Sequence, residues 1–512
     1  MGRYKWVAII GLASGAVFLP VMGAPFVADD YLIFFHVARE GIWGIAITPG
    51  PQFLRPLTSA MYYIEYHLWG LSPLTSHIVS TLTHVICTLL TGVLTKKIAT
   101  KSGLAPEITR RSALISSALF AVLPAHAEAV AWIASRADIM ATIFCLLCLI
   151  LLARDSPSHS TVLETVLFVS CFAVALLFKE SAVVLPLLVV VWLTLGYERD
   201  WKRVLPFAGV AAAYLLTRFL IVGKIGGYAN WGSNLLSPWQ LAMNGIVYLS
   251  HLLQPAPLFG VGRDLWDTLL YLSTGLALLV LVRSRPSTPT ASGFRRLVLL
   301  LCAWTVICML PVLPLKPALG HLMNSRYVYL ASTSMAALAG IWLAQRWDAS
   351  RVRFTFVALV ALYALGTMRL SQAWYWAGRV AQTSLQSLAQ VTSGQKPILL
   401  LSIPDHYRGA YIWRNSLHEA ILLYVPQIKS SVYVLSRFTM RLTPYVSVNY
   451  RDGIVTLSSQ SDIFLPPESH HNLLTGVGEI NITPQRISIG SPLTSRYRLL
   501  RYENGRFVDV TN

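Results

Sequence analysis

Residues 162–195 read VLETVLFVSCFAVALLFKESAVVLPLLVVVWLTL, two apolar runs that are separated by the charged pair Lys179-Glu180. The runs cover 162–178 and 181–195, and each approaches the length that a helix needs to cross the hydrocarbon core of a bilayer. Charged residues between two such runs are typical of a turn at the membrane surface. We therefore predict two consecutive membrane-spanning helices that meet at Lys179-Glu180 on one face of a membrane.

The composition extends this prediction to most of the chain. Of the 512 residues, 55% are hydrophobic and only 12% are charged, whereas a soluble domain carries about 25% charged residues. The formal net charge is +18, which in a soluble protein would suggest nucleic-acid binding. Here the basic residues lie in short loops between apolar runs, which is the positive-inside pattern of membrane proteins, so a nucleic-acid partner is excluded.

Charge and hydropathy together predict eleven membrane crossings, with the N-terminus in the cytoplasm. The first predicted span, residues 6–27, follows Arg3 and Lys5, and its end lacks a good cleavage site, so we expect it to be retained. The stretch 239–253 is short and interrupted by polar residues, and we read it as re-entrant or lying on the outer surface. The remaining spans are predicted at about 74–94, from 113 onward, and at 139–152, 204–222, 265–282, 297–315, 327–343 and 354–368.

The pattern changes after residue 368. A linking helix is predicted over 369–390, and residues 391–512 have the mixed pattern of a small extracytoplasmic α/β domain. Strands are expected at 397–403, 430–435 and 445–457, with a helix at 418–424. Asn504-Gly505 is a hairpin turn signal. The predicted domains are therefore a transmembrane domain (1–368), a linking helix (369–390) and an outer domain (391–512).

Unusual polar residues gather where the predicted spans reach the outer face. Charged side chains at membrane depth cost about 2.5–3.5 kcal/mol on insertion scales, so they usually mark function. Acids and bases on one face suit a substrate with a phosphate and a reactive hydroxyl, because a carboxylate accepts a proton and a cation neutralises a phosphate. The set is Asp29, Asp30, Arg55, His77, His84, His126, Glu128, Arg136, Asp138, Lys179, Glu180 and Arg326.

Each member also has a purely structural explanation. Asp29-Asp30 could cap a helix, and Lys179-Glu180 could be an internal ion pair at a helix junction. Arg326 could anchor a span at the interface. His77 and His84 are more often hydrogen-bonded core residues than metal ligands. His126 and Glu128 lack a standard metal-ligand spacing, and no metal ligand is assigned.

Several short motifs occur in the order seen in a known enzyme group. The chain resembles the GT-C glycosyltransferases, in particular the protein O-mannosyltransferase group that includes the transmembrane and TPR-containing mannosyltransferases, over about residues 1–345. The motifs are Asp29-Asp30-Tyr31, Phe53-Leu54-Arg55-Pro56-Leu57, Gly70-Leu71-Ser72-Pro73 with His77, Pro124-Ala125-His126-Ala127-Glu128, Ser135-Arg136-Ala137-Asp138, Lys179-Glu180 and Ser325-Arg326-Tyr327.

The resemblance implies an all-α, GT-C-like membrane enzyme that moves a mannose-like sugar from a polyprenyl phosphate to an acceptor hydroxyl, with inversion, on the outer face. Asp29 or Asp30 would be the catalytic base, and we favour Asp30 because Asp29 lies nearer the span and could cap it. Arg55, Lys179 and Arg326 would bind the donor phosphate. The pocket would be lined by His77, His126, Glu128, Arg136, Asp138 and Glu180. Some enzymes of this fold need a divalent cation, Mg²⁺ or Mn²⁺, and others do not, so this requirement stays open.

Two departures from the group leave the acceptor open. Leu123-Pro124 stands where the group commonly has His-Pro, and no TPR repeats follow the membrane part. The acceptor is therefore a protein, a lipid or a glycan, in the inner (plasma) membrane of a bacterial-type cell. A polytopic transporter or flippase of a lipid-linked or sugar substrate is the main alternative, although no related halves are visible. A non-catalytic sensor or assembly protein is the third.

Overall fold

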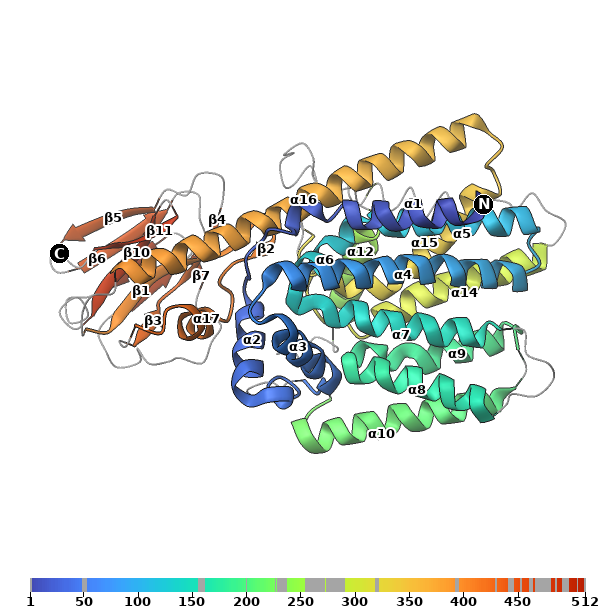
Figure 1. The fold of residues 1–512 in the computed structure, drawn as a ribbon, viewed down its shortest axis with the longest axis horizontal. Helices are drawn as coiled ribbons and strands as arrows, with labels where there is room; N and C mark the ends of the chain where they lie inside the picture. Colours follow the sequence, from blue (N-terminus) through green and yellow to red (C-terminus); the bar gives the residue numbers. More distant parts are fainter. Residues whose placement is uncertain are drawn as a thin grey trace. The chain divides into compact units, whose positions relative to one another are not determined.

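The structure is a computed structural model of the 512-residue chain. It describes residues 2–47, 53–154, 162–198, 200–225, 227, 237–253, 272, 291–317, 322–391, 396–428, 431–440, 446–451, 454–459, 464–465, 480–483, 486–489, 497–503 and 505–510. The chain forms two compact units, drawn in Figure 1. We call Met1–Pro20 with Glu40–Ser371 the helical unit, and Val21–Arg39 with Gln372–Asn512 the mixed unit. Residues 21–39, predicted to belong with the membrane part, thus group with the C-terminal segment.

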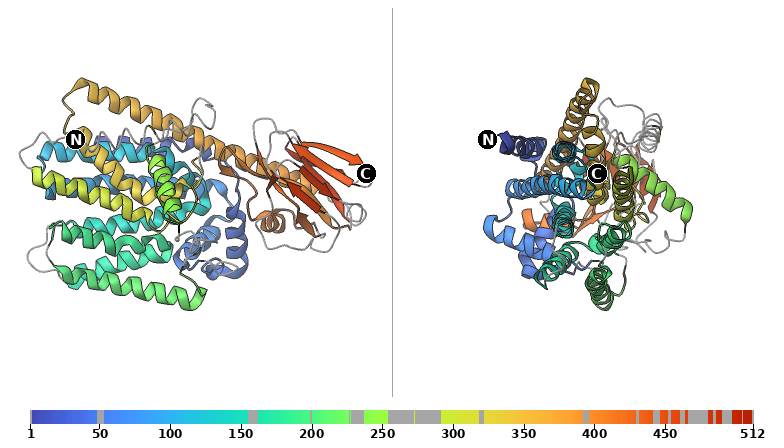
Figure 2. Two further views of the ribbon diagram at one scale, coloured as in Figure 1. Left: turned by 180° about the vertical axis from the view of Figure 1, so that it is seen from behind. Right: turned by 90° about the vertical axis from the view of Figure 1, so that its right-hand side faces the viewer.

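The helical unit is a bundle whose long helices run side by side in both views of Figure 2. Its helices are α1 (Gly2–Ala16), α3 (Pro56–Trp69), α4 (Pro73–Lys101), α5 (Pro106–Val122), α6 (Ala127–Ala131), α7 (Arg136–Leu152), α8 (Val162–Phe178), α9 (Leu185–Thr194), α10 (Val204–Val222), α12 (Pro238–His251), α14 (Ala291–Met309), α15 (Tyr329–Ala344) and the first half of α16 (Ser350–Val391). Short 3-10 helices are η1 (Leu19–Val21), η2 (Gly41–Trp43), η3 (Pro124–His126), η4 (Ile133–Ser135), η5 (Glu180–Val184), η6 (Trp201–Arg203) and η7 (Ser325–Val328).

Within the described residues, five helices are long and apolar enough to cross a membrane, or six if the bent pair Pro106–Val122 and Pro124–Ala131 is one span. The chain is therefore a multi-pass membrane protein, and the number of eleven crossings stays a prediction. Helices α8 and α10 begin and end at the predicted residues. The predicted span at 265–282 lies almost wholly outside the described residues.

Small residues let the central helices approach closely. A Cβ at Gly340 of α15 would lie 2.8 Å from the backbone nitrogen of Ser116 in α5, and one at Gly92 of α4 would lie 3.0 Å from the Ala113 carbonyl oxygen. Membrane helices lack a hydrophobic drive toward one another and use such close backbone contact instead. The contacts therefore bring α4, α5 and α15 together as the centre of the bundle.

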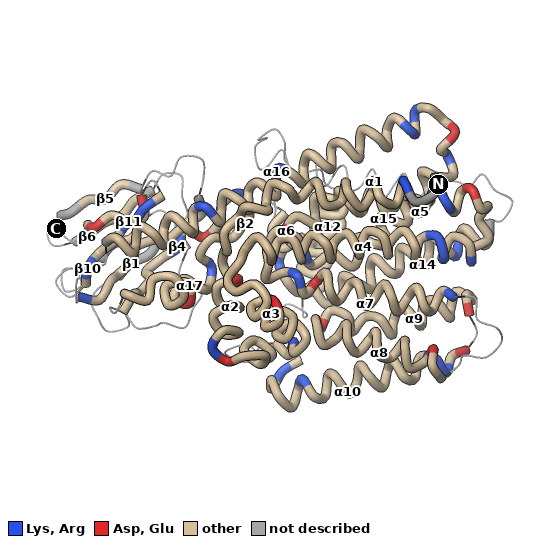
Figure 3. The backbone as a smooth tube through the Cα atoms, viewed as in Figure 1, with Lys and Arg blue, Asp and Glu red and all other residues tan. Residues whose placement is uncertain are grey.

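Most charged residues of the helical unit lie near its two ends (Figure 3). Basic residues gather where α4 ends and where α5 and α14 begin: Lys96, Lys97, Lys101, Arg110, Arg111, Arg295 and Arg296. We call this the basic end. The opposite end, where α5 and α8 finish and α4 and α7 start, carries α3, η3, α6, η4, η5 and η7, and we call it the site end.

One sequence prediction is corrected by these elements. The first span is not one helix over 6–27: α1 ends at Ala16, because Pro20 and Pro25 lack the N–H that a helix interior requires. Residues 124–131 and 133–135 form η3, α6 and η4, whose small apolar residues are buried. The predicted linking helix is confirmed, and it continues the last predicted span as one 42-residue helix, α16.

The mixed unit contains α2 (Asp29–Glu40), the second half of α16, α17 (Leu417–Tyr424) and two sheets. The larger sheet has the order β11-β10-β1-β4-β7, with β2 and β3 also paired to β1, and the smaller has the order β5-β6-β9-β8. Strand β1 is buried along nine of its ten residues, as expected for a strand with parallel neighbours. The strands are β1 (Ile398–Tyr407), β2 (Ala410–Tyr411), β3 (Val432–Val434), β4 (Arg437–Met440), β5 (Val446–Arg451), β6 (Ile454–Ser459), β7 (Phe464–Leu465), β8 (Ile480–Thr483), β9 (Arg486–Ile489), β10 (Arg498–Glu503) and β11 (Arg506–Asp509).

The predicted elements of the C-terminal segment are confirmed in type and near their predicted places, except that the strand expected at 445–457 is the antiparallel pair β5–β6. Strand β1, helix α17 and the antiparallel pair β10–β11 lie where the pattern placed them. Gly505, at the predicted hairpin, has a positive φ of 87°, which a glycine adopts without a steric penalty.

Candidate functional site

Arg55 is fixed at the start of α3. Pro56 occupies the first position of that helix and leaves Arg55 as its N-cap. The Thr58 hydroxyl donates to the Phe178 carbonyl at the end of α8, 2.8 Å away, which holds α3 against the Lys179-Glu180 turn. The Arg55 guanidinium then donates two hydrogen bonds to Glu180, at 2.8 and 2.6 Å. This two-pronged geometry is the one in which arginine binds carboxylates and phosphates most strongly.

Lys179 lies in the break between α8 and η5. Its extended backbone ends α8. The ammonium lies 2.5 Å from a carboxylate oxygen of Asp138, in the first turn of α7, and both side chains are buried. An ion pair is expected here because an isolated buried charge is costly.

Arg326 is carried by η7, which packs against α6. The Ser325 hydroxyl donates to the Ala125 carbonyl at 2.8 Å, and the Arg326 guanidinium donates to the Glu128 carboxylate. The same guanidinium lies over the Trp132 ring, with its carbon 4.7 Å from the ring centroid. Arginine over an aromatic face gains a cation–π attraction, so both the acid and the ring orient it.

Tyr327 joins these pairs into one group. Its ring lies 4.5 Å from the Arg326 guanidinium carbon and 5.4 Å from the Lys179 ammonium. Lys179 is adjacent in sequence to Glu180, the partner of Arg55. We call the six charged residues the ion-pair cluster: Arg55, Glu180, Lys179, Asp138, Arg326 and Glu128. Its three cations come from three separate parts of the chain and are matched by three acids.

Arg136 belongs to a different arrangement. Its side chain is fully buried and ion-paired with Glu65 of α3. It also donates to the Ser80 hydroxyl at 2.9 Å and to the Ser76 carbonyl at 2.7 Å, both on α4. Its donors are thus taken up by protein groups on two helices, and no face of the side chain is open to a ligand. Arg136 was predicted to line a substrate pocket. The observed contacts of its side chain hold α7 against α3 and α4.

His126 lies in an aromatic group rather than in the ion-pair cluster. Its ring contacts Phe120 and Tyr329, with centroids 4.3 and 4.5 Å apart, and its Nε2 is 2.8 Å from the Ser332 hydroxyl. His84 Nδ1 lies 2.7 Å from the Tyr329 hydroxyl. The hydrogen-bonded core role is therefore the one observed for both histidines. His77 is buried on α4, next to Ser76, which hydrogen-bonds Glu65.

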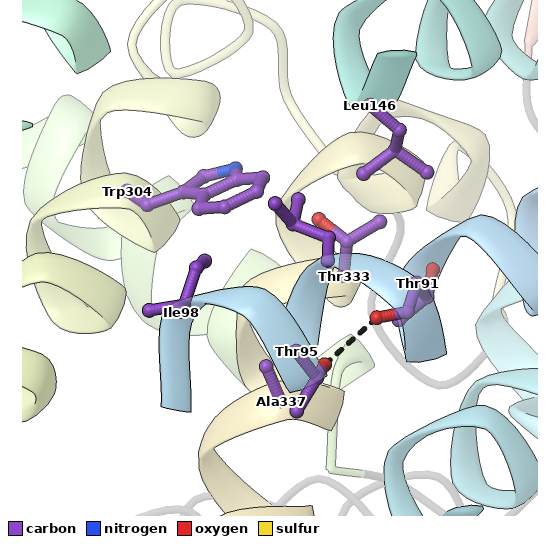
Figure 4. A pocket seen from close by; sticks show the side chains of 8 residues that line it. Thr91, Thr95, Ile98, Leu146, Trp304, Thr333 and Ala337 are labelled. Atoms are coloured by element: carbon purple, nitrogen blue, oxygen red, sulfur yellow. Dashed lines mark hydrogen bonds between the residues drawn. The ribbon is translucent and has the colours of Figure 1, made fainter. Parts of the chain in front are cut away.

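A small cavity lies elsewhere in the bundle. Eight side chains from α4, α7, α14 and α15 line it, among them Thr91, Thr95, Thr333 and Trp304 (Figure 4). It contains no charged residue, so it has nothing to bind a phosphate. In the part of the chain that the structure describes, no group of three His, Cys, Asp or Glu side chains is placed to hold a metal ion.

Asp29 and Asp30 lie in the first turn of α2, in the mixed unit. Asp30 is buried, and its carboxylate accepts a hydrogen bond from the Val27 N–H at 3.0 Å. Asp29 is half-buried, and its carboxylate accepts from the Asn415 side-chain amide at 3.2 Å. Asp30 therefore holds the backbone just before α2, and the cap expected at Asp29 stays a prediction.

Two tyrosines surround Asp30. Burial and the nearby charge of Asp30 raise the pKa of Tyr424 to about 12. Burial, together with Tyr424 and Asp30, raises the pKa of Tyr31 well above its ordinary value. Both phenols therefore keep their protons at neutral pH, and Asp30 lies in an apolar, aromatic setting.

The structure thus brings together six of the predicted site residues and separates others. Arg55, Lys179, Glu180, Asp138, Glu128 and Arg326 form the ion-pair cluster, whereas Arg136 and His126 serve other contacts. Sequence reasoning missed Glu65 and Asn415, and it named Tyr327 only as a member of the Ser325-Arg326-Tyr327 motif. An acid within the apolar run of α3 could have signalled Glu65, but nothing in the sequence pattern signals Asn415.

Part of the chain matches curated proteins. It is 28% identical over 181 residues to the Drosophila melanogaster protein O-mannosyl-transferase Tmtc1, which covers 33% of this chain and 20% of that protein. It is 31% identical over 159 residues to human protein O-mannosyl-transferase TMTC4, covering 28% and 22%. The chain is similar to protein O-mannosyltransferases. It spans about a fifth of the length of these relatives, and no protein-family model matches it.

Two crystal structures of ArnT from Cupriavidus metallidurans also resemble the chain. The apo structure superimposes with a TM-score of 0.48 at 11% identity, covering 97% of this chain and 99% of ArnT. The structure bound to undecaprenyl phosphate gives 0.46 at 14% identity, covering 96% and 99%. Both TM-scores are too low to establish a common fold.

Proposed function

We propose that the protein is a membrane glycosyltransferase that takes a sugar from a polyprenyl-phosphate donor. The observation that carries this proposal is the ion-pair cluster, in which Arg55, Lys179 and Arg326 converge at one end of a membrane bundle. Each of these cations is held by an acid of the chain, and a phosphate oxygen can take the place of a carboxylate oxygen on such a cation. A lipid-linked phosphate is an anion that reaches a membrane protein at this depth.

In the proposed reaction, an acceptor hydroxyl attacks the anomeric carbon of the sugar from the face opposite the phosphate. The new carbon–oxygen bond forms as the bond from that carbon to the phosphate oxygen breaks, which inverts the anomeric centre. The hydroxyl proton passes to a carboxylate, and the electron pair leaves with the polyprenyl phosphate. The cations stabilise the charge that grows on that phosphate.

The acids of the ion-pair cluster hold the cations until the donor arrives. Phosphate oxygens can replace carboxylate oxygens on arginine because both accept two parallel N–H bonds. Arg55 and Glu180 are the most open pair, with 17% and 22% of their side chains exposed, so we propose that the donor phosphate meets Arg55 first. Arg326 and Lys179, more deeply buried, would bind the remaining oxygens.

We propose that the Asp29-Asp30 pair supplies the catalytic base, with Asp29 in that role. A base must reach the proton that it removes, and Asp29 is the more exposed of the two. The hydrogen bond from the Val27 N–H gives Asp30 a structural role. This proposal reverses the order favoured from the sequence, where Asp29 was expected to be the cap.

The sugar, acceptor and orientation follow from the relatives and from charge. Relatives named protein O-mannosyltransferases favour a mannose-like sugar and an acceptor hydroxyl on a protein, with a lipid or a glycan as the other acceptors. The basic end of the helical unit would face the cytoplasm, which places the N-terminus inside. The mixed unit would then lie outside the plasma membrane of a bacterial-type cell.

The test uses the purified full-length protein with a panel of polyprenyl-phosphate sugars, mannose included, and follows the release of polyprenyl phosphate. Parallel reactions contain Mg²⁺, Mn²⁺ or a chelator, which decides the metal requirement. Arg326→Met should abolish release, whereas Arg353→Met, an exposed basic residue on α16, should not. Release of polyprenyl phosphate at the wild-type rate by Arg326→Met and by Asp29→Asn would overturn the proposal. Flux of the lipid-linked sugar across vesicles that survives both changes would favour a transporter.

A further inference from the structure

A short segment of the mixed unit, residues 412–416, contacts the stretch that leads into Asp29. It connects β2 to α17 and lies more than 380 residues further along the chain. The Asn415 amide donates to the Asp29 carboxylate at 3.2 Å. The Ile412 carbonyl accepts a hydrogen bond from the Ala28 N–H at 2.9 Å, and the Ser416 hydroxyl donates to the Ala28 carbonyl. Both backbone groups of Ala28 are therefore held by this segment.

The backbone of Ala28 shows that these contacts impose a conformation. Its φ is 43°, in the left-handed region that a non-glycine residue rarely adopts. Such a conformation persists only where the surroundings over-determine it. Ser416 precedes α17 at the position where a serine usually caps its own helix, yet its side chain makes no such cap and bonds Ala28 instead.

Aromatic packing fixes the other side of the Asp pair. Tyr31 stacks on Trp413, with centroids 5.3 Å apart and an interplanar angle of 27°. Tyr31 also meets Tyr424 of α17 edge-on at 5.7 Å. The Trp413 indole donates to the Ser384 hydroxyl on α16 at 2.9 Å. The segment that holds Ala28 is thus itself anchored to the longest helix of the protein.

We propose that Asn415 is a positioning residue for Asp29, and that segment 412–416 sets the direction in which the Asp29 carboxylate points. The inference rests on the proposed function, in which Asp29 takes the acceptor proton. Asn415 donates to one of the two carboxylate oxygens and so restricts the rotation of the carboxylate. The hydrogen bond also stabilises the ionised carboxylate, which keeps the base in its working form at lower pH.

The test measures kcat and the donor KM of full-length variants across a range of pH, in the polyprenyl-phosphate release assay. Asn415→Ala should lower kcat roughly tenfold, a modest part of the 10²–10⁴-fold that a general base supplies, with little change in donor KM. The acidic limb of the pH–rate profile should move to higher pH. Asn415→Asp, of equal size but bearing a negative charge, should move it further. A wild-type kcat and pH profile in Asn415→Ala would overturn the inference.

Controls separate positioning from simple destabilisation. His418→Ala changes an exposed residue in the first turn of α17 and should leave both kcat and the pH profile unchanged. Asn415→Gln retains the amide donor and should recover part of kcat, so the comparison of Gln with Asp decides the matter if Asn415→Ala does not accumulate. If Arg326→Met and Asp29→Asn both release polyprenyl phosphate at the wild-type rate, the proposed function fails. If Asp29→Asn is inactive while every Asn415 variant matches wild type, only the present inference fails.

Discussion

Two ion pairs attach α3 to its neighbours, and they differ in how completely the protein encloses them. Arg136 and Glu65 have 0% and 4% of their side chains exposed, and serine groups occupy the remaining donors of the arginine. Arg55 and Glu180 have 17% and 22% exposed. Both pairs connect α3 to residues far along the chain, and both contain one arginine and one glutamate.

The difference between the two pairs shows that a buried charge in a membrane bundle does not by itself mark a ligand site. The polar atoms of the enclosed pair are hydrogen-bonded to other protein atoms, so an incoming ligand cannot replace either partner. The open pair keeps an accessible face beside two further cations, so an incoming anion can compete for the arginine. A structural arginine and a ligand-binding arginine therefore differ in the exposure of the side chain and in the presence of other cations nearby. They do not differ in residue type.

The largest effect is expected from breaking the enclosed pair. Glu65→Gln leaves the Arg136 charge without its counter-ion, which costs about 3–5 kcal/mol for a buried pair. The variant should accumulate poorly and unfold at lower temperature in detergent, as followed by thermal unfolding of the purified protein. Arg55→Met is the matched control and should accumulate near the wild-type level. Equal thermal stability of the two variants would contradict the distinction.

The open pair should instead affect activity. Arg55→Met removes a donor from the proposed phosphate site, and loss of one such preorganised donor typically costs about 10²–10³ in kcat. The release of polyprenyl phosphate by purified protein measures this loss. Arg55→Lys should restore only part of it, because lysine lacks the two-pronged geometry. Full activity in Arg55→Met would remove Arg55 from the site.

A third ion pair, in the mixed unit, makes the stability of that unit depend on pH. Burial raises the pKa of Asp405, but the hydrogen bond from His406 and the charges of Arg437 and Arg414 outweigh burial and lower it. Arg437 lies 2.7 Å from the carboxylate. A lowered folded-state pKa stabilises the protein above the unfolded value, about 3.9, and this stability is lost as the pH falls through the folded value.

The mixed unit should therefore lose stability as the pH drops below about 4. Limited proteolysis of the full-length protein across this range, with cleavage in 372–512 as the readout, measures the loss. Asp405→Asn should make that cleavage less dependent on pH and faster at neutral pH. An unchanged pH dependence in Asp405→Asn would show that other carboxyl groups govern this unfolding.

The smallest effect is expected at the basic end. Arg111 contacts Glu107 and Asp348, whose side chains are 62% and 93% exposed. Exposed pairs contribute about 0–1 kcal/mol, and salt screens them. Arg111→Ala should shift the unfolding temperature little, and that shift should vanish at high salt. A shift as large as that of Glu65→Gln would show that exposure is the wrong criterion.

Much of the helical unit could be predicted from apolar runs and their charged ends. Helices α8 and α10 match their predicted bounds because polar or charged residues stand on both sides of each apolar run: residues 156–161 and Lys179 for α8, and Arg203 and Lys224 for α10. The first span was misjudged because hydropathy counts Pro20 and Pro25 as tolerable, while helix hydrogen bonding does not. The second half of α16 is too polar to register as a span, so it was predicted as a separate linking helix over 369–390 and not as a continuation of the last span.

The sequence predicted which charged residues form the candidate site, but it did not predict which of them pair with one another. The three cations of the ion-pair cluster were all named from the sequence. Their partners lie up to 198 residues away, as with Arg326 and Glu128, and a single sequence has no periodicity that connects such positions. Asn415 was missed for the same reason, because its contact with Asp29 spans 386 residues.

The hydrogen bond between Ala28 and Ser416 also determines when the turn at Ala28 can form during synthesis. The two residues are 388 positions apart, and at 5–20 residues per second a ribosome needs roughly 20–80 s to make the chain between them. Until Ser416 emerges, the turn at Ala28 lacks the groups that hold it. The Asp pair is therefore among the first residues to be translated and among the last to reach its final conformation. A nascent chain that stalls before residue 412 would insert its early helices while the conformation of its Asp pair remained unset.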